Sequence, residues 1–248
     1  GPGSAVLRAL AKGTSATIRS LAGNGRSVTM KLAFAFPNGV GKRQFTKEKA
    51  VGVLDVLMGA PDSLKGKVSV FKPIPLESLT AEQRVLADAI RSGPRGAVQN
   101  SAAAKPGPLG GPFNVWLRSP DIGNIIQSLG AAIRFRSSLP PKLNELAIIV
   151  TARQWTSQYE WMAHHRLALE AGLDPAIAEE IAQGRRPAKM SEDEAIVHDF
   201  SRELHETQGV SAATYKTALA RFGERGVMDL IAVNGYYVLV SLCLNVDR

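Results

Sequence analysis

The feature that most constrains the fold is a helical pattern that recurs from Leu79 to the end of the chain. Thr80 and Gln83 have the spacing of a capping box, which predicts a helix from there to about Arg91. Further helices are expected at about 120–136, 140–155, 157–171, 174–183, 191–208, 211–222 and 225–245, with glycines ending four of them: Gly172, Gly184, Gly209 and Gly223. Nothing after residue 75 has the convincing alternation of a strand. The sequence therefore predicts an all-α domain over residues 76–248.

The first 75 residues have a different character. Residues 1–47 contain eight basic and no acidic residues, so the net charge of +8 lies in the N-terminal fifth of the 248-residue chain. We interpret residues 1–4, Gly-Pro-Gly-Ser, as a tag remnant and residues 5–75 as a basic N-terminal extension. Its start resembles a mitochondrial or plastid transit segment, in which a short amphipathic helix would present Val6, Leu7, Leu10, Ile18 and Leu21. A flexible basic arm is the alternative, and the protein would then be cytoplasmic.

Two further elements are expected in this extension. Lys49–Met58 has the pattern of a helix, and Lys67–Phe71 alternates like a short strand. No family motif covers either segment. The extension could pack on the main domain or mediate assembly.

Composition excludes several classes of protein. The net positive charge lies in the extension, so it does not indicate that the main domain has a nucleic-acid-binding fold. A single cysteine, Cys243, excludes an internal disulfide framework and a Cys-x-x-Cys site. The most apolar stretch, Val227–Val246, is interrupted by Asp229, Asn234 and Ser241, so we expect a buried core helix and no membrane span.

The chemistry-bearing residues gather between Glu145 and Gly172. Glu145 interrupts an apolar helical segment, where a carboxylate costs free energy unless it is paired or hydrogen-bonded. Glu160 and His164 are four residues apart and share a helix face. A carboxylate beside an imidazole can move a proton near neutral pH. His165 should face the surface, and His198 and His205 should lie on a solvated helix face.

Two other interpretations of this segment stay open. Ser157 and Glu160 also have the spacing of a capping box, which would be purely structural. Glu160 and His164 could hold a metal, but a third ligand motif is missing, so we expect no metal.

This segment resembles the carboxymuconolactone decarboxylase family, which shares the alkylhydroperoxidase-D fold. Glu145 and His164 match the family's Glu and His, whereas Ser157 and Glu160 stand where the peroxidase branch has its cysteine pair. The likeness extends from about Leu76 to Val246 and includes Ser92-Gly-Pro-Arg-Gly96, Gly111-Pro-Phe-Asn114, Leu139-Pro-Pro141, Phe222-Gly223 and Gly235-Tyr-Tyr237. Without the cysteine pair, we expect the decarboxylase-type branch.

The resemblance implies a cofactor-free lyase that acts on a small carboxylated lactone or keto-acid-like substrate. His164 would donate the proton, and Glu160 and Glu145 would orient it. Arg118 and Arg153 are candidates to hold the substrate carboxylate, with Ser157 and Trp161 near it. The resemblance also implies a homo-oligomer, a trimer or hexamer.

Two other functions remain possible. The chain could be a non-catalytic docking subunit of a larger organellar complex, because its first 75 residues match no family motif. A thiol-type peroxidase is less expected, since the cysteine pair is absent.

Overall fold

The computed structural model describes residues 16–21, 27–32, 70–98 and 103–247, and the chain divides into two compact units, residues 1–67 and 68–248. In the first unit, β1 (Ala16–Leu21) pairs antiparallel with β2 (Ser27–Leu32), and Ala16 lies opposite Leu32. The amphipathic helix predicted here is wrong at Ile18 and Leu21, which belong to β1. The β-branched residues of ATIRSL and SVTMKL suit strands. Val6, Leu7, Leu10 and the expected helix Lys49–Met58 lie outside the described residues.

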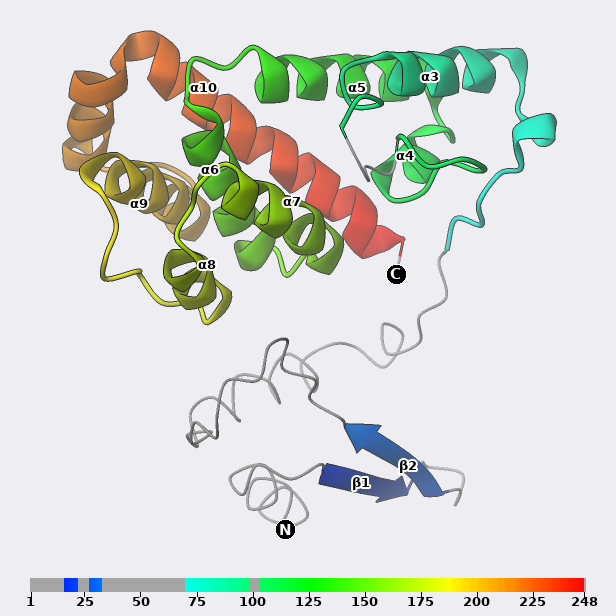
Figure 1. Cartoon of the computed structure of the whole chain (residues 1–248), viewed down its shortest axis with the longest axis horizontal. Helices are drawn as coiled ribbons and strands as arrows, with labels where there is room; N and C mark the ends of the chain where they lie inside the picture. The colour runs from blue at the N-terminus through cyan, green and yellow to red at the C-terminus, as the bar shows by residue number, and fades with distance from the viewer. Residues whose placement is uncertain (1–15, 22–26, 33–69, 99–102, 248) are drawn as a thin grey trace. The chain divides into compact units, whose positions relative to one another are not determined.

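The described part of the second unit is all-helical, as predicted (Figure 1). Its helices are η2 (Leu76–Ser78), α3 (Ala81–Ser92), α4 (Pro112–Trp116), α5 (Pro120–Phe135), α6 (Pro141–Gln154), α7 (Gln158–Glu170), α8 (Pro175–Ala182), α9 (Glu192–Thr207) and α10 (Ala212–Val246). The Thr80–Gln83 capping box forms at the start of α3. The sequence pattern missed the short α4, and the strand expected at Lys67–Phe71 is a bend at the described residues 70 and 71.

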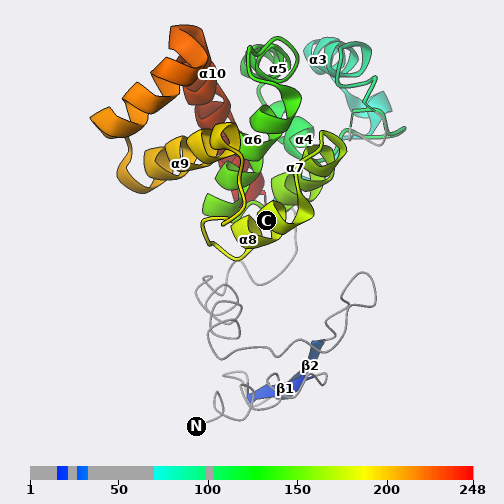
Figure 2. The same ribbon diagram turned by 60° about the vertical axis from the view of Figure 1, so that its left-hand side comes forward.

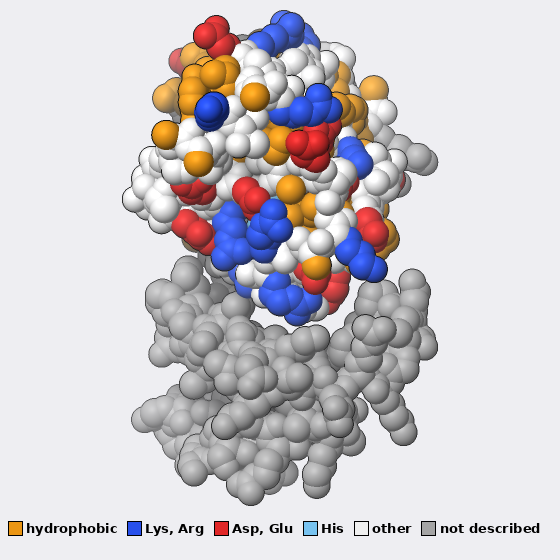
Figure 3. Space-filling view, turned by 90° about the vertical axis from the view of Figure 1, so that its left-hand side faces the viewer, with side chains coloured by type: hydrophobic (Ala, Val, Ile, Leu, Met, Phe, Trp, Pro, Cys, Tyr) orange, Lys and Arg blue, Asp and Glu red, His pale blue; other side chains and the backbone are white. Residues whose placement is uncertain are grey.

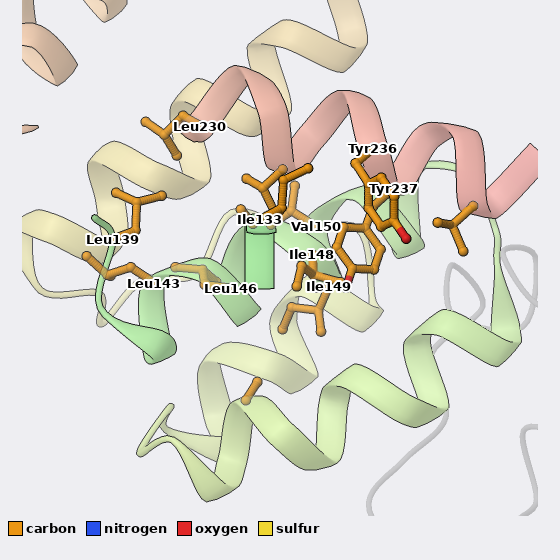
Figure 4. Close-up of a cluster of buried hydrophobic side chains, with 14 of the residues drawn as sticks. Ile133, Leu139, Leu143, Leu146, Ile148, Ile149, Val150, Leu230, Tyr236 and Tyr237 are labelled. Carbon is orange, nitrogen blue, oxygen red and sulfur yellow. The ribbon is translucent and has the colours of Figure 1, made fainter. Parts of the chain in front are cut away.

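Helix α6 is the centre of this unit. Every residue from Leu143 to Ala152 is buried, so the helix is enclosed on all sides, and α7, α8, α9 and α10 contact it (Figures 1 and 2). Leu146, Ile148 and Ile149 belong to the same buried apolar cluster as three residues of α10, Leu230, Tyr236 and Tyr237 (Figure 4). This central position explains why apolar residues surround Glu145: its helix has no solvent face over that stretch.

The outer helices present a charged surface. Arg186 pairs with Asp199 at 2.8 Å and Arg202 with Glu206 at 2.7 Å. Figure 3 shows basic and acidic side chains intermixed on this end of the unit. Such a mosaic is typical of a solvated surface rather than of a patch of one charge.

The histidines of α9 differ from the sequence prediction. His198 is buried and its Nδ1 lies 2.9 Å from Asp199, and His205 is half-buried with its Nε2 2.9 Å from the hydroxyl of Thr151. Burial is the main cause that lowers the pKa of both imidazoles. The solvated face expected for these two residues is therefore wrong, because this face of α9 packs in the interior and buries Glu194 as well as His198.

Helix α10 breaks at Gly223. Its φ of 67° and ψ of 179° are non-helical and lie in a region that only glycine enters readily. The two helices predicted at 211–222 and 225–245 thus meet at this residue. Gly172 and Gly184 also have positive φ, but after α9 the left-handed residue is Gln208 rather than the expected Gly209.

We expect Gly223→Ala to lower the free energy of unfolding by about 1–3 kcal/mol, because alanine is strained in this backbone conformation. No neighbouring atom lies within 4 Å of an added Cβ, so a clash would not contribute. Chemical denaturation measures the change. Glu224→Ala, at the exposed next residue, is the control and should change stability by less than about 0.5 kcal/mol. Equal effects of the two substitutions would contradict the strain argument.

Candidate active site

The candidate site lies where α7 packs on α6. A tight turn at Thr156, with φ of 51°, reverses the chain so that α7 runs back along α6. Glu160 and His164 share the face of α7 that meets Glu145 of α6. Helical spacing sets the first pair, and the packing of the two helices adds the third residue.

His164 bridges the two carboxylates. Its Nδ1 lies 2.6 Å from Glu145 Oε2, and its Nε2 lies 3.3 Å from Glu160 Oε2. All three side chains are buried, with residue exposures of 8% for Glu145, 3% for Glu160 and 5% for His164. With an ionised carboxylate on each side, both ring nitrogens would carry a proton, so this arrangement favours the charged form of the imidazole. The structure thus brings the three residues together in a chain of charge-assisted contacts.

The electrostatics favour the same protonation state. Burial on its own lowers the pKa of His164, but the charges of Glu145 and Glu160 and the hydrogen bonds to them outweigh burial and raise it overall. The ring of Tyr237 meets the imidazole edge-on, with centroids 4.9 Å apart. The two carboxylates therefore favour the charged form of this buried imidazole.

A cavity of about 290 Å³ opens beside this chain of residues. Glu160 and His164 line it, whereas Glu145 lies behind them. Basic and aromatic side chains form much of the remaining wall: Arg95, Lys105, Arg134, Arg166, Phe113, Trp116, Tyr159, Tyr236 and Tyr237. The volume is at the small end of the range for ligand pockets, so the site suits a small, negatively charged molecule.

Four residues predicted to bind substrate do not line this cavity. Arg118 donates to the carbonyl of Lys72 and lies over the ring of Phe71, and Arg153 donates to the carbonyl of Ala182 at 2.8 Å. Trp161 stacks on the half-buried His165, with ring centroids 5.5 Å apart. The two arginines are therefore engaged with backbone elsewhere, and Arg95 and Arg134 stand at the cavity in their place.

The fourth of these residues is Ser157, and the capping box expected between it and Glu160 is absent. The side chain of Ser157 is buried and makes no hydrogen bond, although the residue does precede the first turn of α7. The backbone N–H of Ser157 donates to the carbonyl of Ala152 at 2.9 Å, so it is not available to Glu160. The carboxylate of Glu160 turns to His164 instead.

The wall also contains residues that helical spacing could not reveal. Arg134 approaches Glu145 at 3.8 Å, and its Nε is buried without a hydrogen-bond partner. Tyr236 and Tyr237 come from the far end of the chain, and their rings meet edge-on at 5.2 Å. The only sequence signal for Tyr236, Tyr237 and Arg95 was their place in the Gly235-Tyr-Tyr237 and Ser92–Gly96 motifs.

Among the described residues, no group of three or more His, Cys, Asp or Glu side chains is arranged to hold a metal ion. Both ring nitrogens of His164 face carboxylates, those of Glu145 and Glu160. The three side chains therefore lie in a row, with His164 between the two carboxylates.

The described part of the second unit is thus a helical domain in which a buried histidine lies between two carboxylates. The model of the carboxymuconolactone decarboxylase family matches residues 120–195, from the start of α5 to the start of α9. The match covers 76 of the 248 residues, so this stretch is similar to that family, whose domain is of the alkylhydroperoxidase-D-like helical type. The match contains Glu145, Glu160 and His164 and is shorter than the likeness expected from Leu76 to Val246. A comparison with curated protein sequences gives no significant match.

Proposed function

We propose that the protein is a cofactor-free, decarboxylase-like lyase for a small carboxylated lactone or keto-acid-like substrate. The observation that carries the proposal is the buried Glu145–His164–Glu160 chain at the wall of a cavity rich in basic residues. The imidazolium supplies a proton, and the basic wall accommodates both the anionic substrate and a transient anion.

The two contacts of His164 suggest a division of roles. The short contact to Glu145, on the side away from the cavity, holds the ring and favours its charged form. The longer contact to Glu160 lies at the cavity, where a substrate can compete for the Nε2 proton. When the bond between the substrate carbon and its carboxylate breaks, carbon dioxide leaves and the electron pair remains as an enolate or dienolate. The proton from Nε2 then neutralises that carbon, and a proton from water restores the imidazolium.

Thiol chemistry has less support. Burial is the main cause that raises the pKa of the Cys243 thiol, so the thiolate is scarce at neutral pH. Cys243 is the single cysteine of the chain and does not line the cavity. These facts favour acid–base chemistry over a thiol peroxidase.

The direct test is release of carbon dioxide from a panel of small carboxylated lactones and β-keto acids. We expect turnover of at least one member by the full chain. Glu160→Gln should reduce that turnover by a factor on the order of 10 to 100, because the carboxylate beside Nε2 is lost while the side chain keeps its size. Glu170→Gln, on the exposed end of the same helix, is the matched control and should retain full activity. Equal turnover by the wild type, Glu160→Gln and Glu170→Gln would contradict a chemical role for this site.

We also propose that the helical unit forms a homo-oligomer, a trimer or hexamer. The second half of α10 has an exposed apolar stripe, in which Met228, Ile231, Leu239, Leu242 and Val246 are 37–62% exposed. Ile122, Ile125 and Leu129 of α5 are exposed as well. Helix α10 is long and apolar enough to cross a membrane, which by itself is weak support for a span, since core helices meet the same criterion. Its opposite face packs in the core through Leu230, Val233 and Tyr237, which favours protein rather than lipid around it.

Light scattering at micromolar concentration should give three or six times the monomer mass. Leu239→Glu should lower this mass toward that of the monomer, because it places a charge within the α10 stripe. Tyr215→Glu introduces the same charge on the first half of α10, where Tyr215 is 44% exposed, and should leave the mass unchanged. A wild-type protein that scatters as a monomer would refute this proposal.

A further inference from the structure

Tyr237 of α10 combines deep burial with a hydroxyl group that has no protein partner. The residue is only 2% exposed, and buried tyrosine hydroxyls usually find a hydrogen-bond partner. Among the residues that the structure describes, none forms a hydrogen bond with this hydroxyl. The hydroxyl of the adjacent Tyr236, in contrast, accepts a hydrogen bond from Arg95 at 3.3 Å.

The hydroxyl of Tyr237 faces the cavity. Several unpartnered polar atoms are sealed inside the core, among them the hydroxyls of Ser157 and Ser241, but that of Tyr237 is not one of them. The residue forms part of the cavity wall together with Glu160 and His164. A hydroxyl that is neither bonded nor sealed must reach the open space that its side chain lines. A ligand in the cavity can therefore supply the missing partner.

The ring of Tyr237 is held between two other rings. It meets the imidazole of His164 edge-on, with centroids 4.9 Å apart, and it meets the ring of Tyr236 in the same manner at 5.2 Å. Figure 4 shows Tyr237 and Tyr236 on α10 within the buried apolar cluster. This packing fixes the hydroxyl on the same wall as the proton donor before any ligand binds, as in a preorganised site.

This hydroxyl can donate a hydrogen bond while it keeps its proton. Burial is the main cause that raises the pKa of Tyr237 well above its usual value; the charge of Arg134 opposes this effect, and the charges of Glu160 and Glu145 add to it. The phenol is therefore neutral at physiological pH. Its role differs from that of His164, whose charged form has an acidic proton to transfer.

Loss of carbon dioxide creates a negative charge that a neutral donor stabilises. When the bond to the departing carboxylate breaks, its electron pair is delocalised onto the oxygen of the neighbouring carbonyl group, which becomes an enolate oxygen. A hydrogen bond to this oxygen is stronger than one to the neutral carbonyl, so it lowers the barrier. Transfer of the His164 proton to carbon then restores the carbonyl, and the O–H bond of the phenol stays intact throughout.

We propose that Tyr237 is a further catalytic residue of this site and donates a hydrogen bond to the enolate oxygen that forms in the reaction. This inference rests on the proposed function. It requires that a carbonyl group of the substrate be conjugated with the carbon that loses its carboxylate.

Binding of an enolate mimic tests the proposal without turnover. The probe para-nitrophenolate is a small planar oxyanion, and nitrobenzene is the same ring without that oxygen. The wild-type protein should bind para-nitrophenolate at least about tenfold more tightly than Tyr237→Phe does, because the variant lacks one hydrogen bond to a charged acceptor. Both proteins should bind nitrobenzene equally, since phenylalanine keeps the ring that packs against His164. Calorimetry at a pH where the free probe is ionised measures both affinities.

Tyr215→Phe is the matched control. It removes a hydroxyl from the same helix, but Tyr215 is 44% exposed and does not line the cavity, so its affinity for both probes should equal that of the wild type. Circular dichroism checks that each variant is folded.

Kinetics on a substrate identified by carbon dioxide release give a second measurement. Tyr237→Phe should lower kcat by about ten- to a hundredfold and change KM by less than about twofold, because the hydrogen bond strengthens only as the charge develops. A raised KM with unchanged kcat would assign the hydroxyl to ground-state binding and overturn the proposal.

Equal affinity of the wild type and a folded Tyr237→Phe variant for para-nitrophenolate would also overturn it. Failure of the proposed function is a different result, in which the wild type releases no carbon dioxide from any member of the panel. Weaker binding of para-nitrophenolate by Tyr237→Phe would in that case still support an oxyanion-binding hydroxyl in the cavity.

Discussion

His164→Gln should reduce turnover by a factor on the order of 10² or more, the usual contribution of a positioned general acid. The His164 ring lies between Glu145 and Glu160 at the cavity wall and can donate a proton when it is charged. Glutamine has no acidic proton to donate. Steady-state kinetics on a substrate identified by carbon dioxide release provide the measurement. His165→Gln is the matched control, because the adjacent histidine stacks on Trp161 and does not line the cavity.

The structure changes what this substitution should do to stability. Glutamine is polar and similar in size to histidine, which on its own would leave folding almost unchanged. The histidine is in fact the counter-ion of two buried carboxylates, and glutamine would leave both without their nearest cation. We therefore expect a loss of about 3–5 kcal/mol, and activity must be compared well below the unfolding temperature. A folded His164→Gln variant with undiminished turnover would defeat the assignment of the proton donor.

Glu145→Ala should lower the free energy of unfolding by about 3–5 kcal/mol, because it removes the nearer carboxylate from a buried ion pair. Because the pKa of His164 is raised in the folded protein, this loss of stability should depend on pH. The stabilisation is fully present below the unfolded-state pKa of about 6.5 and disappears as pH rises through the higher pKa of the folded protein. The difference between wild type and Glu145→Ala should thus be largest in mildly acidic solution and shrink toward alkaline pH.

Urea denaturation at several pH values measures this dependence, and an NMR titration of the imidazole should show a lower pKa in the variant, since burial then dominates. Glu170→Ala removes an exposed carboxylate that pairs with Arg166 and should change stability by less than about 1 kcal/mol at every pH. A stability loss in Glu145→Ala that grows with rising pH would contradict the charge pairing.

Apart from α4, the α-helices of the main domain could be predicted from the sequence alone. Caps and breaks are local, so Thr80 with Gln83 marked the start of α3, and Gly223 marked the break in α10. The Glu160–His164 pair was also predictable, since residues four apart in a helix share a face. Glu145 drew attention because a carboxylate within an apolar helix requires a partner.

The tertiary structure determines which contacts these residues make. Glu160 could have capped α7, but its carboxylate meets His164 of the same helix, and the packing of α7 on α6 adds Glu145 to this pair. The cavity is also lined by three residues from segments far apart in the chain: Arg95, Arg134 and Tyr236. Helical periodicity cannot predict contacts between such distant segments. Arg118 and Arg153 had the right chemistry for an anion site, but the fold placed backbone carbonyls beside them. Helical periodicity acts over one or two turns, whereas the walls of a cavity are assembled from helices that only the folded core brings together.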